Sequence, residues 1–389
     1  MVTFQGFAGG TGFQFVGNIN LRFGTGAAHT LPAELGALGA RRPFVMVDPG
    51  VLQGNVAAPI LKALEVAGVS AHVFSEIEPN PRDDTIHGAF EVARSAGCDS
   101  IVGIGGGSAM DSAKGVGLLM TNGGRLADYD GTNKVVKDLP PVVAIPTTAG
   151  TGSEVTANAA LTRSGDHYKM SLRSPRLLPK LAIVDPLLLR TLPRSVAAAS
   201  GLDALTHAIE GFLSVRASPL SDFFAIRAIE LMAPNIRAFV ANPENLEAAS
   251  SMALGSMMAG LVVSNTGTGN DHALARALGG LCDLTHGVAT AMLLPHVMSF
   301  NASARPDRYY AIARAMAIPA DGTPREVASR TVTEIQQLLQ DLDMPTRLRD
   351  VGVSQDKLTA VVDVALKNVG PNPRRTSAKD LEKILMAVY

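Results

Sequence analysis

The first half of the chain alternates short β-branched runs with alanine-rich stretches of helical period. Helical periods cover residues 55–67 and 84–96. Runs typical of buried strands occupy residues 43–48, 70–74, 100–104, 141–145 and 181–184. Strands separated by helices of about 10–15 residues predict βαβ units and a parallel sheet. We therefore expect a Rossmann-like α/β domain with a parallel sheet.

The pattern changes near residues 191–194, after which strand signals nearly vanish. A chain of 389 residues has room for two domains. We predict an α/β domain over residues 1–192 and an all-helical domain over residues 193–389. The opening segment 13–23 alternates enough to be a hairpin or an edge strand. Helical periods in the second half cover residues 195–214, 220–241, 245–263, 271–277 and most of the chain beyond residue 307.

Composition disfavours nucleic acid and membranes as partners. The 34 Lys and Arg residues balance the 35 Asp and Glu residues, and no basic tract stands out. Apolar runs such as residues 311–320 are interrupted well short of the roughly 20 residues of a membrane span. The first 13 residues lack the pattern of a secretory signal. Two cysteines, Cys98 and Cys282, cannot form a disulfide framework. We expect a cytoplasmic protein.

A glycine loop follows the predicted strand at residues 100–104 and precedes a helical pattern, in the segment SIVGIGGGSAMDSAK. Glycines let backbone N–H groups approach a ligand closely, and a helix N-terminus favours an anion. Gly106, Gly107 and Ser108 would cradle a pyrophosphate, and Asp111 would cap the helix or bond a cofactor hydroxyl. The spacing is not the strict dinucleotide fingerprint, so a turn that merely requires positive φ is the alternative.

Two further strand ends carry polar side chains. Ligands of open α/β sheets bind at the carboxyl ends of the strands. Asp48 ends the run PFVMVD, where a carboxylate accepts both ribose hydroxyls of an adenosine and repels a 2′-phosphate. The alternative is an Asp that starts an Asp-Pro-Gly turn. The loop PTTAGTGSEVT offers the hydroxyls of Thr147, Thr148, Thr151 and Ser153.

Four residues of the second half form a candidate metal site. Asp203 and His207 are four residues apart, which places both on one helix face. His272 and His286 follow, fourteen residues apart, with two glycines between them. One carboxylate and three imidazoles suit Fe²⁺ or Zn²⁺ with an open position. The alternative is a set of hydrogen-bonded core histidines, with Asp203 paired to His207 alone. His296 is a further candidate to line the same site.

These motifs, taken together, resemble the iron-dependent (group III) alcohol dehydrogenases. The resemblance implies an N-terminal nucleotide-binding domain, a helical metal-binding domain and catalysis in the cleft between them. The similar segments lie in the family's order along almost the whole chain: EPNP (78–81), GGGSAMDSAK (105–114), PTTAGTGSEVT (146–156), LAIVDPLLLRTLP (181–193), GLDALTHAIE (201–210), THGVATA (285–291) and NPRRTSAKDLEKIL (372–385).

The resemblance also implies roles for individual residues. Lys169 is similar to a lysine that reaches the cofactor ribose, and Asp48 matches the strand-end acid associated with NAD rather than NADP. The metal ligands implied are Asp203, His207, His272 and His286. The other cofactor contacts implied are Gly106, Gly107, Ser108, Asp111, Thr147, Thr148, Thr151 and Ser153.

One position departs from the family pattern. Many members carry a second histidine four residues after the third ligand, and here that position is Arg276. An arginine is a poor general acid or base at neutral pH. Arg276 and His286 are our predicted catalytic residues. For Arg276 we expect either a grip on a substrate anion or the orientation of a water; an ion pair with Asp271 or Asp283 is the structural alternative.

The resemblance implies a metal-dependent, NAD-linked alcohol dehydrogenase or aldehyde reductase. Reversible hydride transfer would join nicotinamide C4 and a primary alcohol or aldehyde, with Fe²⁺ expected and Zn²⁺ or Mn²⁺ as alternatives. A hydroxy acid or semialdehyde is the alternative substrate. A homodimer or larger homo-oligomer is expected. Two other hypotheses are a non-redox lyase of the dehydroquinate synthase type, disfavoured by Asp203 where that class uses glutamate, and a nucleotide-binding scaffold with a degenerate site.

Overall fold

The chain forms two compact units. The computed structural model describes residues 12–389 except residue 167. Residues 1–11, which carry most of the segment compared with a secretory signal, lie outside the described residues. The α/β unit comprises residues 16–193 and 243–257. The helical unit comprises residues 194–242 and 258–389, with the described residues up to Phe15. The predicted ranges were continuous, whereas residues 243–257 group with the first unit.

A six-stranded parallel sheet organises the α/β unit, in the order β1-β9-β6-β4-β2-β3. All five predicted strand runs lie in it, which confirms the predicted fold class. The segment 13–23 contributes the edge strand β1, parallel to β9, rather than a hairpin. The strands are β1 (Asn20–Phe23), β2 (Pro43–Val47), β3 (His72–Phe74), β4 (Ser100–Gly105), β6 (Val142–Pro146) and β9 (Leu181–Val184).

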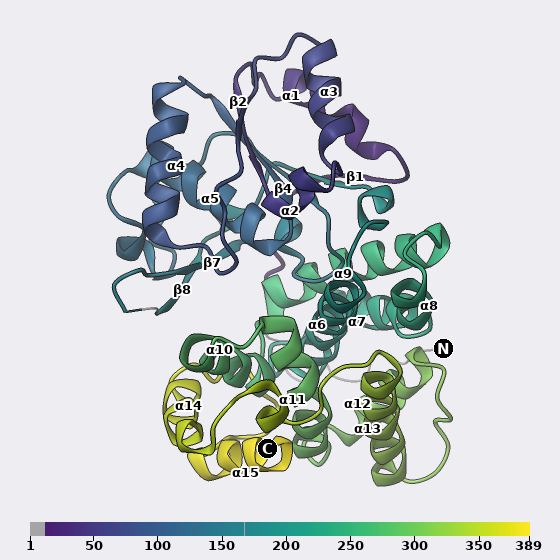
Figure 1. Ribbon diagram of the computed structural model, residues 1–389. Coiled ribbons are helices and arrows are strands. Elements are labelled where there is room, and N and C mark those ends of the chain that lie inside the picture. Colours follow the sequence, from purple (N-terminus) through teal and green to yellow (C-terminus); the bar gives the residue numbers. More distant parts are fainter. Residues whose placement is uncertain (1–11, 167) are drawn as a thin grey trace. The chain divides into compact units, whose positions relative to one another are not determined.

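Helices cover both faces of this sheet (Figure 1). Successive side chains of a strand point to opposite faces. Phe44 and Met46 of β2 therefore join the apolar core under α4 and α5, and Val45 and Val47 join the core under α1 and α3. The helices of this unit are α1 (Leu31–Ala37), α2 (Pro49–Gln53), α3 (Ala58–Val66), α4 (Asp83–Ser95) and α5 (Gly107–Asn122).

The strand order reverses beside β2. The chain leaves β2 for the edge strand β3 and then returns to place β4 on the other side of β2. Such a reversal opens a crevice at the carboxyl ends of the two neighbouring strands. The ends of β2 and β4 are Val47 and Gly105, next to the predicted cofactor residues.

A second, smaller sheet was not predicted. Its order is β5-β8-β7, with β7 and β8 antiparallel. The strands are β5 (Gly131–Thr132), β7 (Asn158–Thr162) and β8 (Lys169–Arg173).

The helical unit is built on α10, α11, α14 and α15, whose apolar side chains form one core. The predicted helix over residues 220–241 is two helices, α7 and α8. The helices from α6 onward are α6 (Arg194–Leu213), α7 (Pro219–Met232), α8 (Ile236–Ala241), α9 (Leu246–Thr266), α10 (Asn270–Cys282), α11 (His286–Asn301), α12 (Pro306–Ala315), α13 (Pro324–Asp341), α14 (Leu358–Leu366) and α15 (Ala378–Val388).

One helix corrects the expectation about apolar runs. By length and composition α9 is apolar enough to cross a membrane, with Glu247 its single charged residue. Small Ser, Gly and Ala residues alternate with the larger apolar residues along α9, so the helix contains no long unbroken run of large apolar side chains. Its most apolar window is 56% buried inside the protein, as in the core helix of a globular protein.

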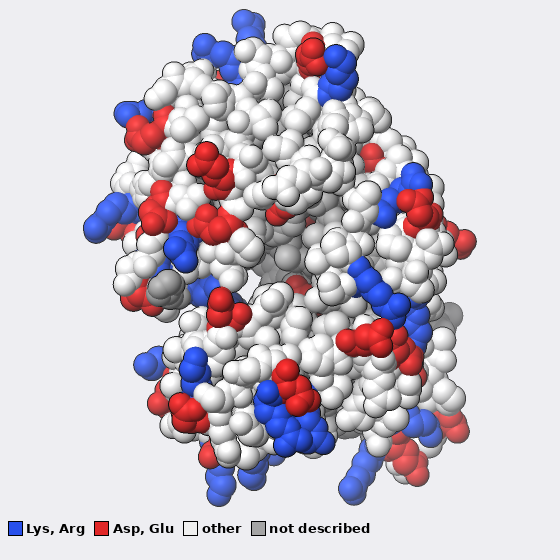
Figure 2. Space-filling view, viewed as in Figure 1, with Lys and Arg blue, Asp and Glu red and all other residues white. Residues whose placement is uncertain are grey.

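Acidic and basic side chains are interspersed on the face shown in Figure 2. No extended basic area is seen on that face, in keeping with the balanced charge of the chain.

Candidate active site

The ends of β2 and β4 lie in contact through a glycine. Gly105 has φ +153°, and a Cβ atom there would lie 2.7 Å from Ala109 Cβ and 2.8 Å from Asp48 Cβ. No larger residue fits this position. Asp48 begins α2, and its Oδ1 accepts hydrogen bonds from the backbone N–H groups of Gly50 and Val51. The Asp-Pro-Gly turn is therefore present, and the half-buried carboxylate also borders the crevice.

The glycine loop and the threonine loop, residues 146–156, touch each other. A Cβ atom on Gly107 would lie 2.8 Å from Thr151 Cγ2, and one on Gly106 would lie 3.6 Å from Thr148 Cγ2. These four residues and Ser108 are all partly exposed. Gly107 is the first residue of the 16-residue helix α5, so unpaired N–H groups and the positive end of the helix dipole meet here. This is a surface suited to an anion such as a diphosphate.

Three predicted cofactor contacts are instead buried. Asp111, Thr147 and Ser153 are 8%, 2% and 3% exposed. Asp111 Oδ1 accepts a 2.5 Å hydrogen bond from the Ser153 hydroxyl, and Asp111 Oδ2 accepts from the backbone N–H of Ala160. Of its two expected roles, Asp111 therefore does not fill that of a cap on α5, because its carboxylate is directed inward to neighbouring segments.

Lys169 on β8 donates a hydrogen bond to the side-chain oxygen of Asn80. Asn80 lies in the EPNP segment with φ 57°, a left-handed conformation that asparagine tolerates. Sequence reasoning quoted this segment without assigning Asn80 a role. Its direct contact with Lys169 makes it a further candidate at the ribose end of a cofactor.

In the helical unit, the predicted metal ligands converge. Asp203 and His207 project from one face of α6, and His272 joins them from α10. A ligand atom of each lies within 4.8 Å of the other two. The Asp203 carboxylate lies 4.0 Å from His207 Nδ1, 3.6 Å from His272 Nε2 and 3.7 Å from His286 Nε2. His286 is outside the tight group of three but faces the same carboxylate.

These residues fit a divalent metal. His207 Nδ1 and His272 Nε2 are buried and have no hydrogen-bond partner, so each presents an unsatisfied ring nitrogen that a metal ion would satisfy. Donors 2.0–2.2 Å from one tetrahedral ion lie about 3.4 Å apart, close to the separations observed. The His286 side chain is 38% exposed, whereas Asp203 is 4% exposed. His286 therefore marks the open side of the site.

Glu210 supports the site and was missed by sequence reasoning. It lies seven residues after Asp203 on the same face of α6, and its Oε2 lies 2.7 Å from His272 Nδ1. Its oxygens also accept the backbone N–H groups of Gly269 and Asp271 at the start of α10. A Cβ atom on Gly269 would lie 2.9 Å from Glu210 Oε1, so glycine permits this approach. Such a carboxylate fixes the ring orientation and tautomer of a metal-binding histidine.

Burial and neighbouring charges tune these groups. Burial is the main cause that lowers the pKa of His272 well below its usual value, which keeps the imidazole neutral. Burial alone would raise the pKa of Asp203, but positive charge on the adjacent imidazoles, first of all His207, holds it below its usual value. Thr290 also donates to Asp203 Oδ1 at 3.1 Å. A neutral imidazole and an ionised carboxylate are the states that bind metals.

Two hydrogen bonds hold the side chain of Arg276. Its Nε donates to the carbonyl oxygen of His272, and its Nη2 donates to the hydroxyl of Thr268. Neither oxygen of Asp271 has a hydrogen-bond partner. Burial, followed by the charges of Glu210 and Asp203, raises the pKa of Asp271 well above its usual value. The hydrogen bonds of Arg276 to His272 and Thr268 hold its guanidinium on α10.

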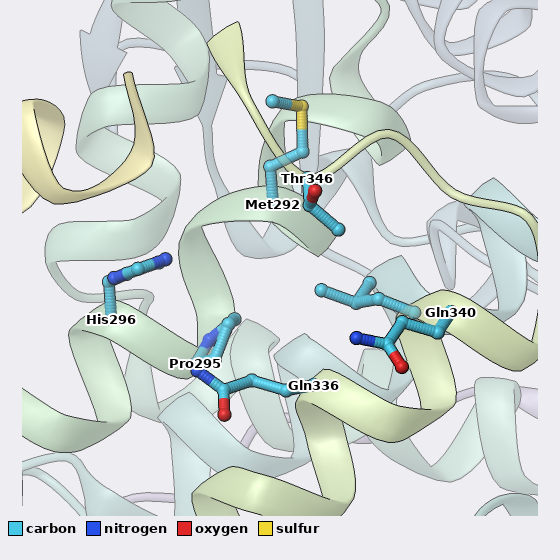
Figure 3. A pocket seen from close by; sticks show the side chains of 7 residues that line it. Met292, Pro295, His296, Gln336, Gln340 and Thr346 are labelled. Atoms are coloured by element: carbon cyan, nitrogen blue, oxygen red, sulfur yellow. The ribbon is translucent and has the colours of Figure 1, made fainter.

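His296 lies away from the metal ligands. It follows His286 by ten residues on α11, about 15 Å along a helix. There it lines a cavity of about 300 Å³ between α11 and α13, with Gln336 and Gln340 among the other lining residues (Figure 3). The expectation that His296 lines the metal site is wrong.

Comparisons with known proteins point to one family. A family described as iron-containing alcohol dehydrogenase matches residues 19–186, and its C-terminal counterpart matches residues 197–389. A 1,3-propanediol dehydrogenase of Citrobacter freundii is 39% identical over 96% of this chain and 98% of its own length. An NAD-dependent methanol dehydrogenase of Bacillus methanolicus is 34% identical over 93% and 96%. A solved 1,3-propanediol oxidoreductase superposes with a TM-score of 0.95, at 37% identity over 97% of this chain and 100% of its own.

Proposed function

Because this chain belongs to the iron-containing alcohol dehydrogenase family, we propose that it interconverts a primary alcohol and its aldehyde with NAD and Fe²⁺. The observation that supports this best is the convergence of Asp203, His207 and His272, with two buried ring nitrogens that lack partners. The oxidoreductase class follows from the family, whereas the metal, the dinucleotide and the alcohol are proposals. Zn²⁺ and Mn²⁺ suit the same ligands.

The chain's own residues prepare the metal site. A bound divalent metal supplies Lewis acidity that lowers the pKa of an alcohol, and bound NAD supplies the hydride acceptor. Glu210 accepts a hydrogen bond from His272 Nδ1–H and so directs Nε2 into the site. Thr290 orients the Asp203 carboxylate. The exposure of His286 leaves one side open, where we place the substrate oxygen.

We place the dinucleotide on the α/β unit. The exposed backbone at Gly106, Gly107 and Ser108 would hold its diphosphate, with the Thr148 and Thr151 hydroxyls beside it. Lys169 would hold a ribose, as the family resemblance implies, and Asn80 would help through its hydrogen bond to Lys169. The negative charge of Asp48 at the strand end favours NAD, because it repels the 2′-phosphate of NADP.

The test measures the metal-dependent formation of reduced nicotinamide, which is detected by its absorbance. Apo-protein prepared without oxygen is reloaded with Fe²⁺, Zn²⁺ or Mn²⁺ and assayed with short alcohols under NAD or NADP. We expect turnover only with metal, with NAD preferred by about tenfold or more, since one unfavourable charge contact is worth about 1.4 kcal/mol or more. Tight NAD binding without turnover on any alcohol would favour the lyase or the degenerate site.

A substrate that carries an anion is the second candidate. Arg276 lies one helical turn after His272, and two contacts hold its guanidinium in place. A fixed guanidinium beside the metal ligands suits a substrate carboxylate. The alternative role in orienting a water requires no anionic substrate.

Replacing Arg276 with His is expected to lower the preference for hydroxy acids over matched neutral alcohols by about 10–100-fold, since a hydrogen bond to a charged group contributes about 1.5–3 kcal/mol. The measurement is the ratio of kcat/KM for each matched pair. Arg227→Ala, on the exposed side of α7, is the control that leaves the ratio unchanged. An unchanged ratio in Arg276→His would rule out anion binding by this residue.

We further propose a cytoplasmic homo-oligomer. Supporting observations are the two free cysteines, Cys98 and Cys282, and the sheet edge that β1 presents. Light scattering of the purified protein tests the oligomeric state, and a monomer at working concentration would contradict it.

A further inference from the structure

Lys114 is a fully buried cation beneath the two loops of the proposed cofactor site. It lies on α5, seven residues after Gly107, and is 0% exposed. Buried lysines are rare unless they are paired. Lys114 is the last residue of the GGGSAMDSAK segment, and the sequence alone predicted no role for it. Its complete burial excludes direct contact with a ligand at the surface of the loops.

The ammonium group joins three separate segments of chain. Lys114 Nζ donates to Ser153 Oγ at 2.8 Å and to the carbonyl oxygen of Asn158 at 2.7 Å. It also lies 3.2 Å from the carbonyl oxygen of Thr156 and 3.4 Å from Asp111 Oδ1. Ser153 belongs to the threonine loop, and Asn158 is the first residue of β7. One side chain thus ties α5 to the threonine loop and to the strand after it.

Asp111 completes the same network from α5. Its two oxygens accept from the Ser153 hydroxyl at 2.5 Å and from the Ala160 backbone N–H at 2.9 Å. Burial lowers the pKa of Lys114, and Asp111 opposes this shift. Charge-assisted hydrogen bonds of this kind hold their partners more firmly than neutral ones.

The exposed surface above this network depends on the spacing of the two loops. Gly107 and Thr151 pack with no room for a Cβ atom between them. The Ser153 backbone N–H donates to Thr151 Oγ1 at 3.3 Å, so the residue that Lys114 holds is bonded to the residue that faces the glycine loop. A shift of Ser153 therefore moves Thr151 relative to the N-terminus of α5.

We propose that Lys114 is the positioning residue of the cofactor site: it fixes the threonine loop against the glycine loop and so sets the affinity for a dinucleotide diphosphate that it does not touch. This inference rests on the proposed function, which places the diphosphate on these loops. Lys114 acts through Ser153 and Asp111. Site residues held within about 0.5 Å by such supports bind far better than loosely held ones.

The test compares Lys114→Met with the double variant Lys114→Met/Asp111→Leu, measured by NADH fluorescence titration. Methionine keeps the volume but not the donors, and leucine removes the carboxylate that would otherwise remain buried without its cation. We expect both variants to bind NADH at least tenfold more weakly than the wild type. The KM for NAD should rise in parallel, while kcat at saturating NAD stays within about threefold.

Two further readouts separate positioning from general stability. Backbone amides of residues 147–160 should exchange hydrogen faster in Lys114→Met, and the double variant should regain most of the lost Tm without regaining affinity. Ser153→Ala, which removes one of the contacts of Lys114, should weaken NADH binding by a smaller factor. This variant tests the proposal if Lys114→Met does not fold.

Wild-type NADH affinity in a folded Lys114 variant would overturn the proposal while leaving the cofactor site intact. A fall in kcat with an unchanged KM for NAD would overturn it as well. Failure of the wild type to bind NADH or NADPH is a different outcome, because it removes the site assignment on which the proposal rests.

Discussion

Replacement of Asp203 with Ala is expected to abolish metal retention and to lower kcat/KM by about three orders of magnitude or more. Asp203 is the one carboxylate among the predicted ligands, and all three imidazoles face it at 3.6–4.0 Å. Loss of Lewis-acid assistance costs several kcal/mol of transition-state stabilisation, and each 1.36 kcal/mol is a tenfold change in rate. The direct measurement is bound metal per chain after equilibrium dialysis against buffered Zn²⁺ or Fe²⁺.

Graded variants make this prediction specific. Glu210→Gln should weaken metal binding by about 10–100-fold, because a neutral amide oxygen accepts the hydrogen bond from His272 Nδ1–H less strongly than a carboxylate does. His29→Ala, at an exposed histidine of the α/β unit, should leave the metal content unchanged. One equivalent of metal retained by Asp203→Ala would contradict the ligand set.

Much of the fold was predictable because its signals are local. The strands β2, β4, β6 and β9 are runs of β-branched and apolar residues buried on both faces, so they are visible without knowledge of their neighbours. The small sheet was not, because β7 (NAALT) and β8 (KMSLR) carry little β-branched character. Their pairing is a property of the folded unit.

The candidate site was also predictable only in part. The i, i+4 spacing of Asp203 and His207 follows from helix geometry alone, so sequence was sufficient to pair them. Glu210 continues that face, but its role depends on the start of α10 lying against α6, which no local pattern encodes. Ser153 and Asp111 were predicted as cofactor contacts because their residue types suit that task, and only the structure shows that they bond to each other.

Glu154→Gln is expected to remove a pH dependence of stability from the α/β unit. Glu154 is 3% exposed in the short 3₁₀ turn Ser153–Val155. Burial raises its pKa from 4.5 to about 7, opposed by its own backbone N–H and by the charge of Lys114. The folded state therefore keeps a proton that the unfolded chain releases between pH 4.5 and about 7. The contribution of this group to stability is greatest below pH 4.5 and falls as pH rises through that range.

The size of the effect follows from the shift. At 1.36 kcal/mol for each pKa unit, the free energy of unfolding of the wild type should fall by about 3 kcal/mol between pH 4.5 and pH 8 through this group. Glutamine has the same shape and no ionisation, so the variant should match the wild type near pH 4.5 and exceed its stability at pH 8. Urea unfolding followed by circular dichroism at several pH values measures the difference. Glu76→Gln, at an exposed position, is the matched control that leaves the wild-type pH profile intact. Parallel profiles for the wild type and Glu154→Gln would contradict the prediction, because they would show that Glu154 is already ionised in the folded protein. Lys114 would then lie near two buried ionised carboxylates, Asp111 and Glu154.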